Sequence, residues 1–533
     1  MPRRLTTASA ILVLFGALWF GNAQAQGDLV VAVRADAEPA SLDYHVDPYF
    51  WTALINTFVA DTLVFLHPET KQYEPFLATG WEMSPDGLTW TFTLRDDVVF
   101  HDGTPFNAEA VKANIERVKA PETASTFAAD LIGPIAAVNV LDEFTVEVVY
   151  ESPHPVVSHA FARIPMWSPT AFSQYAIGEF DRHLTGSGPF TLAEWVPNSH
   201  IRMVRNDTYD WGPSYKVEPG PVKLDSITFR YVGEQTILGT IVTTDEANVV
   251  SELPPQYVPD YLDSPRYQLV AGPVDNTGLQ FIMNVTRAPL DNLTVRRAIR
   301  HAVSTQIIND LAFDGLWTEL YGPLNTTHPC YWDGANSAYP YDPERARALL
   351  DEAGWVLEGG SSVRVAQSVE GVADGTPLQM TLVILGREEI AEIIDASLRQ
   401  VGIGVSIELV PGPVQLERAQ NKDFDLIMQR LRGNDGSLMS RVWKAANDRP
   451  GGWAWSGFRN DELEAVLDQL DNTLDFEARC ELARTAQQIV TEFAPHLPSV
   501  DQPTYWVLDA NVRDWTLGPE GNWFTVYNTY IAD

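Results

Sequence analysis

Cysteine and basic residues are both scarce in this sequence, and each shortage argues against a class of protein. The 533 residues include only two cysteines, Cys330 and Cys480, too few for a disulfide framework, and the sequence leaves open whether they pair. Lysine and arginine number 36 against 71 aspartate and glutamate, so the formal net charge is −35. A surface of that sign repels phosphate backbones, which argues against nucleic acid as a partner.

Motifs of catalysis and metal binding are missing as well. Residues 186–189, GSGP, lack the spacing of a G-x-S-x-G nucleophile turn, and there is no H-E-x-x-H, EF-hand or G-x-x-x-x-G-K-[ST] segment. The ten histidines are scattered, and His154 and His159 are expected to be ordinary loop or surface residues. We therefore predict no metal, no cofactor and no enzyme. A secreted hydrolase remains an alternative only if its active residues come together from distant segments.

One short apolar run stands out, at the amino terminus. Two arginines at 3 and 4 precede the apolar residues 11–20, and Ala23-Gln24-Ala25 follows. This is the pattern of a secretory signal peptide over residues 1–25, cleaved after Ala25, so the mature protein is expected in the periplasm. The run has about half the ~20 residues that a membrane span requires. No cysteine follows the cleavage point, which disfavours a lipid anchor.

What the sequence does contain is material for a large core. Hydrophobic residues make up 45% of the chain, with 16 Trp, 18 Tyr and 23 Phe, and the length favours two or three domains. Alternating and helical patterns interleave, which is typical of an α/β fold. The expected strands are 28–34, 90–94, 145–150, 380–385 and 404–410, and the expected helices are 108–118, 295–312, 343–354, 388–401, 461–470 and 476–493. The succession from 380 to 410 favours a parallel sheet with covering helices.

Several segments resemble, in order, the family 5 extracellular solute-binding proteins, which include dipeptide-, oligopeptide- and nickel-binding proteins of ABC importers. The most specific one lies in residues 74–106, which contain PFLATGWEMSPDGLTWTFTLRDDVVFHDGTPF. The others are PASLD (39–43), GSGPFTLAEW (186–195), RNDTYDWG (205–212), FIMN (281–284), PLDNLTVRRAIRHA (289–302) and YDPERARALLDEAGW (341–355). Together they span nearly the whole mature chain.

The resemblance implies a type II periplasmic-binding-protein fold: two α/β lobes joined by crossing strands, with an extra domain inserted in the first. The implied boundaries are 28–68, 186–277 and 505–533 for the first lobe, 69–185 for the inserted domain and 278–504 for the second lobe. The implied function is capture of a peptide or similar small, anionic solute by lobe closure, for delivery to the permease subunits of an ABC transporter. A monomer is expected. The alternative cargoes are a nickel chelate, an opine or an oligosaccharide.

Aromatic residues in two of these regions are candidates for the ligand cleft. Tyr44, Tyr49 and Trp51 follow PASLD, where relatives send residues of the first lobe into the cleft, and Trp455 flanks the later part of the second lobe. Large, stiff rings supply contact area at low entropic cost. Asn284 ends a strand near the hinge and is expected to hydrogen-bond the ligand or to hold the crossover. The alternative for each aromatic residue is a place in the core.

The loop after residues 424–428 departs from the peptide binders of the family. Those proteins have a Gly-Trp and then an aspartate that receives the peptide amino terminus, whereas this chain has QRLRGNDGS, with Asn434 at the aspartate position and Asp435 one residue later. Arg432 in the same loop, and Arg387, near the arginine that dipeptide binders use for the ligand carboxylate, suggest a carboxylate-bearing ligand. The alternative is that these arginines pair with nearby acidic residues.

Overall fold

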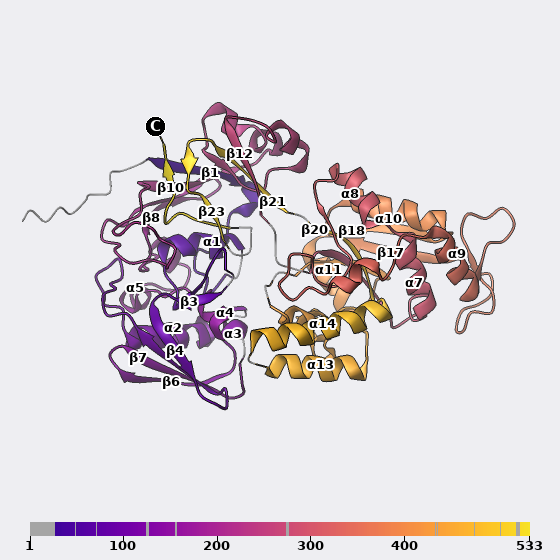
Figure 1. The fold of residues 1–533 in the computed structure, drawn as a ribbon, viewed down its shortest axis with the longest axis horizontal. Coiled ribbons are helices and arrows are strands. Elements are labelled where there is room, and N and C mark those ends of the chain that lie inside the picture. Colours follow the sequence, from indigo (N-terminus) through magenta and orange to yellow (C-terminus); the bar gives the residue numbers. More distant parts are fainter. Residues whose placement is uncertain are drawn as a thin grey trace, which may run out of the picture.

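The computed structural model forms two lobes, each built around its own sheet (Figure 1). The first lobe contains the amino-terminal half of the chain and the last strands, and the second contains the segments between them. The residues that the structure describes are 27–47, 50–70, 72–123, 127–154, 157–272, 277–431, 433, 435–473, 475–501, 503–518 and 523–532. The architecture is α/β, as the sequence predicts.

The first lobe holds a seven-stranded mixed sheet in the order β12-β21-β11-β1-β10-β9-β8. Its central strand β1 runs parallel to β10 and β11, and the remaining pairs are antiparallel. The strands are β1 (Asp28–Arg34), β8 (Phe190–Val196), β9 (His200–Arg205), β10 (Ser226–Val232), β11 (Val249–Val250), β12 (Tyr267–Gly272) and β21 (Thr504–Asp509). Leu29 and residues 31–33 of β1 are buried in the core, as expected for a central strand with covered faces.

A second, antiparallel sheet of four strands lies at the far end of the first lobe (Figure 1). Its order is β4 (Ala78–Met83), β5 (Thr89–Leu94), β7 (Thr145–Tyr150) and β6 (Ile135–Asp142). Helix α2 (Ala108–Lys119) covers it, and the Asn107 side chain caps this helix by accepting a hydrogen bond from the Ala110 N–H.

The second lobe is organised by a six-stranded sheet in the order β14-β20-β13-β19-β17-β18. The strands are β14 (Thr318–Glu319), β20 (His496–Asp501), β13 (Leu279–Met283), β19 (Leu426–Gln429), β17 (Gln379–Ile384) and β18 (Gly404–Leu409). Helix α10 (Glu388–Gln400) connects β17 to the parallel strand β18, as predicted. The sheet as a whole is mixed, however, because β13 is antiparallel to both neighbours. The expectation of a parallel sheet holds only on one side.

The predicted helix 295–312 is two helices, α7 (Leu293–Ala302) and α8 (Thr305–Phe313). Val303 between them is extended, and the Ser304 hydroxyl accepts a hydrogen bond from the Ile307 N–H, so a new helix starts there. A polar cap inside an apolar periodic run is easily overlooked because the apolar spacing continues across it. The other predicted helices of this lobe form: α9 (Pro343–Glu352), α10, α13 (Asp461–Asn472) and α14 (Phe476–Phe493).

Each lobe is held together by one further contact. Cys330 and Cys480 form a disulfide that joins the segment after β14 to helix α14 within a buried cluster. In the first lobe, Gly186 and Gly188 let the chain approach helix α1 (Phe50–Val59), since a Cβ on Gly188 would lie 2.6 Å from the carbonyl carbon of Val59. The glycine segment therefore packs closely against the end of this helix.

No helix among the described residues combines the length and the apolar character that a bilayer crossing needs.

Candidate functional site

The site of interest is the face between the lobes, where the chain crosses twice, from β12 to β13 and from β20 to β21. Tyr505 in β21 fastens this junction, because its hydroxyl donates to the carbonyl of Leu316 in the second lobe at 2.5 Å. Its own carbonyl accepts from the Leu253 N–H of the first lobe at 2.9 Å. Thr277 and Leu431 exchange two further hydrogen bonds at 2.9 and 3.0 Å. The two lobes are therefore tied together at this hinge (Figure 1).

Charged side chains from both lobes gather at this junction. Arg34 ends the central strand β1, and Glu252 follows β11 in the first lobe; Arg430 follows β19, and Arg387 precedes α10 in the second. Burial lowers the pKa of Arg387, the charges of Arg430 and Arg34 lower it further, and Glu389 and Glu252 oppose them. Burial also lowers the pKa of Arg430, against the opposing charge of Asp501 and Glu252. The four groups thus interact across the two lobes.

Arg387 has an unusual backbone that sets the direction of its side chain. Its φ is +60°, in the left-handed region, which is uncommon for a residue with a Cβ and is often associated with functional sites. The guanidinium lies 5.0 Å from the centre of the Trp317 ring, a cation–π contact. The side chain is 33% exposed, so one side of the guanidinium rests on an indole and part of it reaches solvent.

Two of the ion pairs between these arginines and acids are longer than a hydrogen bond. Arg387 Nη1 is 3.7 Å from Glu389 Oε1, and Arg34 Nε is 3.5 Å from Glu252 Oε2. Charge-assisted hydrogen bonds are shorter, about 2.7–2.9 Å. Three arginines and three acids, with Asp501 as the third, make the junction nearly neutral in total.

A second contact between the lobes lies further from the hinge. His159 in helix α4 (Val157–Phe161) of the first lobe has Nδ1 3.0 Å from the Tyr73 hydroxyl. Burial lowers the pKa of His159, the charge of Arg163 adds to that, and Asp435 of the second lobe opposes it. His159 is half-buried in a short helix at the lobe junction, so its expected place in a loop or on the open surface is wrong. His154 is also half-buried, and its Nε2 lies 3.1 Å from the Leu131 carbonyl oxygen.

Asp435, a candidate for recognising a ligand amine, already has a partner in the second lobe. Its Oδ2 lies 2.6 Å from Arg479 Nη2, and its Oδ1 accepts the Ser437 N–H at 2.7 Å. In this conformation the carboxylate is neutralised from within the lobe. Asn434 and Arg432 lie outside the described residues.

The aromatic candidates and Asn284 are buried among protein side chains. Tyr44 is 2% exposed and hydrogen-bonds Arg163. Trp51 belongs to the core of the first lobe, and Trp455, in the core of the second, donates to the Gly452 carbonyl. Asn284 donates to the carbonyls of Lys422 and Phe424. Tyr49 lies outside the described residues. A ligand role for this set stays a prediction.

Sequence reasoning missed Arg34, Glu252 and Arg163. Arg34 ends an apolar strand and Glu252 comes soon after one. Polar groups gather at the ends of strands in α/β proteins, and this position in the sequence could have pointed to both residues. Arg163 gave no such signal, because it follows an apolar helix in a segment without a motif. Among the described residues, no three His, Cys, Asp or Glu side chains lie close enough together to hold a metal ion.

The chain is similar to a known protein family and to proteins of known structure. The family model described as bacterial extracellular solute-binding proteins, family 5 Middle, matches residues 72–453. The glutathione-binding protein GsiB of Salmonella typhi is 28% identical over 505 residues, covering 93% of each chain.

Two solved structures show the same fold. NikA from Brucella suis in complex with Fe(III)-EDTA has a TM-score of 0.81 at 23% identity and covers 95% of this chain and 99% of its own. DppA from Helicobacter pylori in complex with the peptide STSA has a TM-score of 0.75 at 21% identity, with 96% and 99% covered. Both likenesses concern the two-lobed architecture.

Proposed function

The chain belongs to family 5 of the bacterial extracellular solute-binding proteins, and from this premise we propose that its cargo is a short peptide with a free carboxylate, of about the size of glutathione. As a member of this family it is the substrate-binding component of an ABC importer. The relatives named for glutathione support the size and class of the cargo. The single observation that carries the proposal is the group of arginines from both lobes at the hinge.

The arginines would hold the ligand carboxylate. Arg387 reaches solvent beside Trp317, and Arg430 and Arg34 interact with it from the second and the first lobe. A carboxylate placed between them would form short, charge-assisted hydrogen bonds with the guanidinium groups. Since the arginines come from both lobes, those bonds form only when the lobes close, which gives the ligand its differential affinity for the closed form. Asp435 is not assigned the ligand amine, because Arg479 neutralises it.

The rest of the proposal concerns the setting in which the protein works. The protein acts in the periplasm after cleavage following Ala25, as a monomer, with the domain boundaries given above, and it passes its cargo unchanged to permease subunits in the inner membrane. The remaining residues of the predicted cleft, Tyr44, Tyr49, Trp51, Asn284, Arg432, Asn434 and Trp455, belong to this proposal as secondary contacts.

Calorimetric titration with glutathione and with the dipeptide Met-Leu tests the ligand class. We expect micromolar or tighter binding of at least one of them, and at least a tenfold loss in Arg387→Ala and in Arg430→Ala, because hydrogen bonds between charged groups contribute about 1.5–3 kcal/mol. Arg345→Ala is the matched control: it removes the same charge from an exposed position on helix α9 of the same lobe. Unchanged affinity in both hinge variants would contradict the carboxylate anchor.

Two further measurements address closure and the absence of turnover. Small-angle scattering should show a smaller radius of gyration with saturating ligand than without it. Chromatography of the ligand recovered after a long incubation should return it intact. Appearance of a product would show that the protein is an enzyme.

A further inference from the structure

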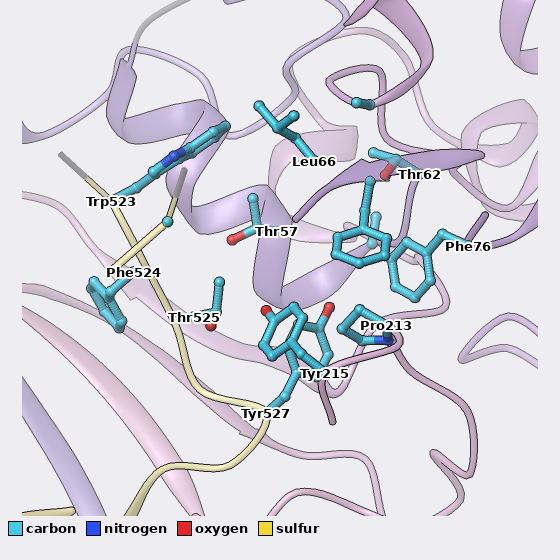
Figure 2. Close-up of a pocket in the computed structure, with 14 residues that line it drawn as sticks. Thr57, Thr62, Leu66, Phe76, Pro213, Tyr215, Trp523, Phe524, Thr525 and Tyr527 are labelled. Carbon is cyan, nitrogen blue, oxygen red and sulfur yellow. The ribbon is translucent and has the colours of Figure 1, made fainter. Parts of the chain in front are cut away.

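A cavity of about 100 Å³ lies in the first lobe where α1, the hairpin of β2 (Val64–Leu66) and β3 (Tyr73–Pro75), and the carboxy-terminal hairpin of β23 (Thr516–Leu517) and β24 (Phe524–Thr525) meet. Figure 2 shows aromatic rings around it, from Trp523 on one side to Phe76 on the other. Phe65, Leu66 and Pro213 complete the apolar part of the wall. This volume equals that of about three water molecules at ~30 Å³ each, so the cavity could hold about three to four non-hydrogen atoms of a ligand.

Thr57, Thr62 and Tyr527 in the wall have hydroxyl groups with partners, whereas Thr525 Oγ1 and Trp523 Nε1 are buried without a hydrogen-bond partner among the described residues. Thr57 Oγ1 donates to the Leu54 carbonyl at 2.7 Å, and Thr62 Oγ1 donates to the Val64 carbonyl at 2.6 Å. The Tyr527 hydroxyl is hydrogen-bonded to Tyr209. Burial raises the pKa of Tyr527 and Tyr215 above the ordinary tyrosine value, so both stay neutral. The cavity therefore presents an uncharged, mainly aromatic surface to whatever enters it.

The cavity lies toward the junction with the second lobe. Ala162 forms part of its wall, and the next residue, Arg163, places its guanidinium 5.3 Å from the centre of the Trp523 ring. The same short segment carries His159, which interacts with Asp435 of the second lobe. Figure 1 shows α4 and β3 on the side of the first lobe that faces the second. A solute held between the lobes would meet this wall.

We propose that the cavity is a subsite for one small, uncharged side chain of a bound peptide, a thiol, thioether or short alkyl group. This rests on the proposed function. Arg163 at the rim disfavours a lysine or arginine side chain by charge repulsion, and the uncharged wall offers no compensation for a buried carboxylate. The volume excludes large aromatic side chains.

A series of tripeptides γ-Glu-X-Gly, titrated calorimetrically, tests this subsite. With X as cysteine or 2-aminobutyrate we expect the wild-type protein to bind about tenfold more tightly than with X as glycine, because two buried groups of methylene size each favour binding severalfold. X as lysine or tryptophan should bind no better than glycine. The variant Ala162→Leu fills the cavity, so it should reduce the cysteine-to-glycine ratio below twofold while the glycine peptide keeps its affinity within about threefold.

Two controls separate the possible outcomes. Ala353→Leu adds the same atoms at a half-buried position of the second lobe and should leave the ratio unchanged. Ala162→Val serves if the leucine variant does not fold. If the ratio in the filled variants equals that of the wild type, the subsite is wrong and the proposed function stands. If the wild-type protein binds none of the tripeptides and neither glutathione nor Met-Leu, both are overturned.

Discussion

Asp435 and Arg479 form a largely buried ion pair, with 2.6 Å between Oδ2 and Nη2 and with 16% and 3% of their side chains exposed. Asp435 lies in the loop after β19 and Arg479 in α14, so the pair fastens this loop to the helix that also carries Cys480. Burial alone would raise the pKa of Asp435, but Arg479 and hydrogen bonds from Ser437 lower it below the ordinary value. The carboxylate is thus charged, and Arg479 of the same lobe balances that charge.

Arg479→Ala should destabilise the protein by about 3–5 kcal/mol, because it leaves a buried carboxylate without a counter-charge. Urea unfolding at pH 7 measures this. The exposed pair of Arg484 and Glu481 on the same helix is the control, and Arg484→Ala should cost about 0–1 kcal/mol. The double variant Asp435→Ala, Arg479→Ala should lose less than the sum of the two single losses. Simple additivity would mean that the pair contributes no coupling energy.

Reduction of the disulfide should weaken the second lobe. Cys330 and Cys480 are 150 residues apart in sequence, and closing so long a loop restricts the unfolded chain, a stabilisation of about 2–5 kcal/mol. Urea unfolding with and without a phosphine reductant should show a loss of that size in the wild-type protein. The variant Cys330→Ala, Cys480→Ala should not respond to the reductant; a response there would point to an effect other than disulfide reduction.

Acid should destabilise the protein in part through His45. This residue is fully buried, with Nε2 3.0 Å from the Pro165 carbonyl oxygen and Nδ1 2.9 Å from Arg117 Nη1. Burial lowers its pKa to about 4. Between the unfolded value of about 6.5 and pH 4 the unfolded chain therefore binds a proton that the folded protein does not, so stability falls as the pH falls.

The size of this effect follows from the two pKa values. Lowering the pH from 7 to 5 should remove about 2 kcal/mol through His45, so the stability gap between the wild-type protein and His45→Asn should shrink by that amount. Urea unfolding at the two pH values gives the gap. His183→Asn, at an exposed position, serves as the control for replacing a surface histidine with asparagine. A His45→Asn gap that is equal at pH 7 and pH 5 would contradict the assignment.

Gly188 should tolerate no side chain. A Cβ there would lie 2.6–2.8 Å from backbone atoms of Phe58, Val59 and Ala60 at the end of α1, and backbone cannot move aside as a flexible side chain can. Gly188→Ala is therefore expected to cost about 1–3 kcal/mol in urea unfolding. Gly80→Ala is the control, because a Cβ at Gly80 meets nothing within 4 Å. Equal stability of the two variants would show that the close approach relaxes freely.

Local features were predictable because their causes are local. Asn107 caps its helix through the side chain of a residue three positions before the donor, and the β-rich alternation of residues 28–34 is enough to mark a strand. The break before Ser304 was missed because the apolar spacing continues across it. The extended backbone of Val303 ends the first helix there, and Ser304 caps the second. The Ile307 N–H donates a hydrogen bond to the Ser304 hydroxyl, so α8 begins here, where the sequence predicted one continuous helix.

Contacts between distant segments were not predictable in the same way. Nothing in the local pattern places Arg34 near Arg387, or His159 near Asp435, because each pair is brought together by the crossing of the chain between two sheets. It also left the pairing of Cys330 and Cys480 open. A distance between residues that are more than a hundred positions apart depends on every element between them.

By itself, the amino-acid sequence determined the α/β class, most helix and strand positions and the family, because these depend on periodicity, caps and ordered motifs. The tertiary structure alone decided which charges meet at the hinge, that Asp435 is taken by Arg479, and that a small aromatic cavity lies toward the second lobe. The physical reason is that charge pairing and cavity shape depend on the three-dimensional placement of side chains, which local patterns do not specify.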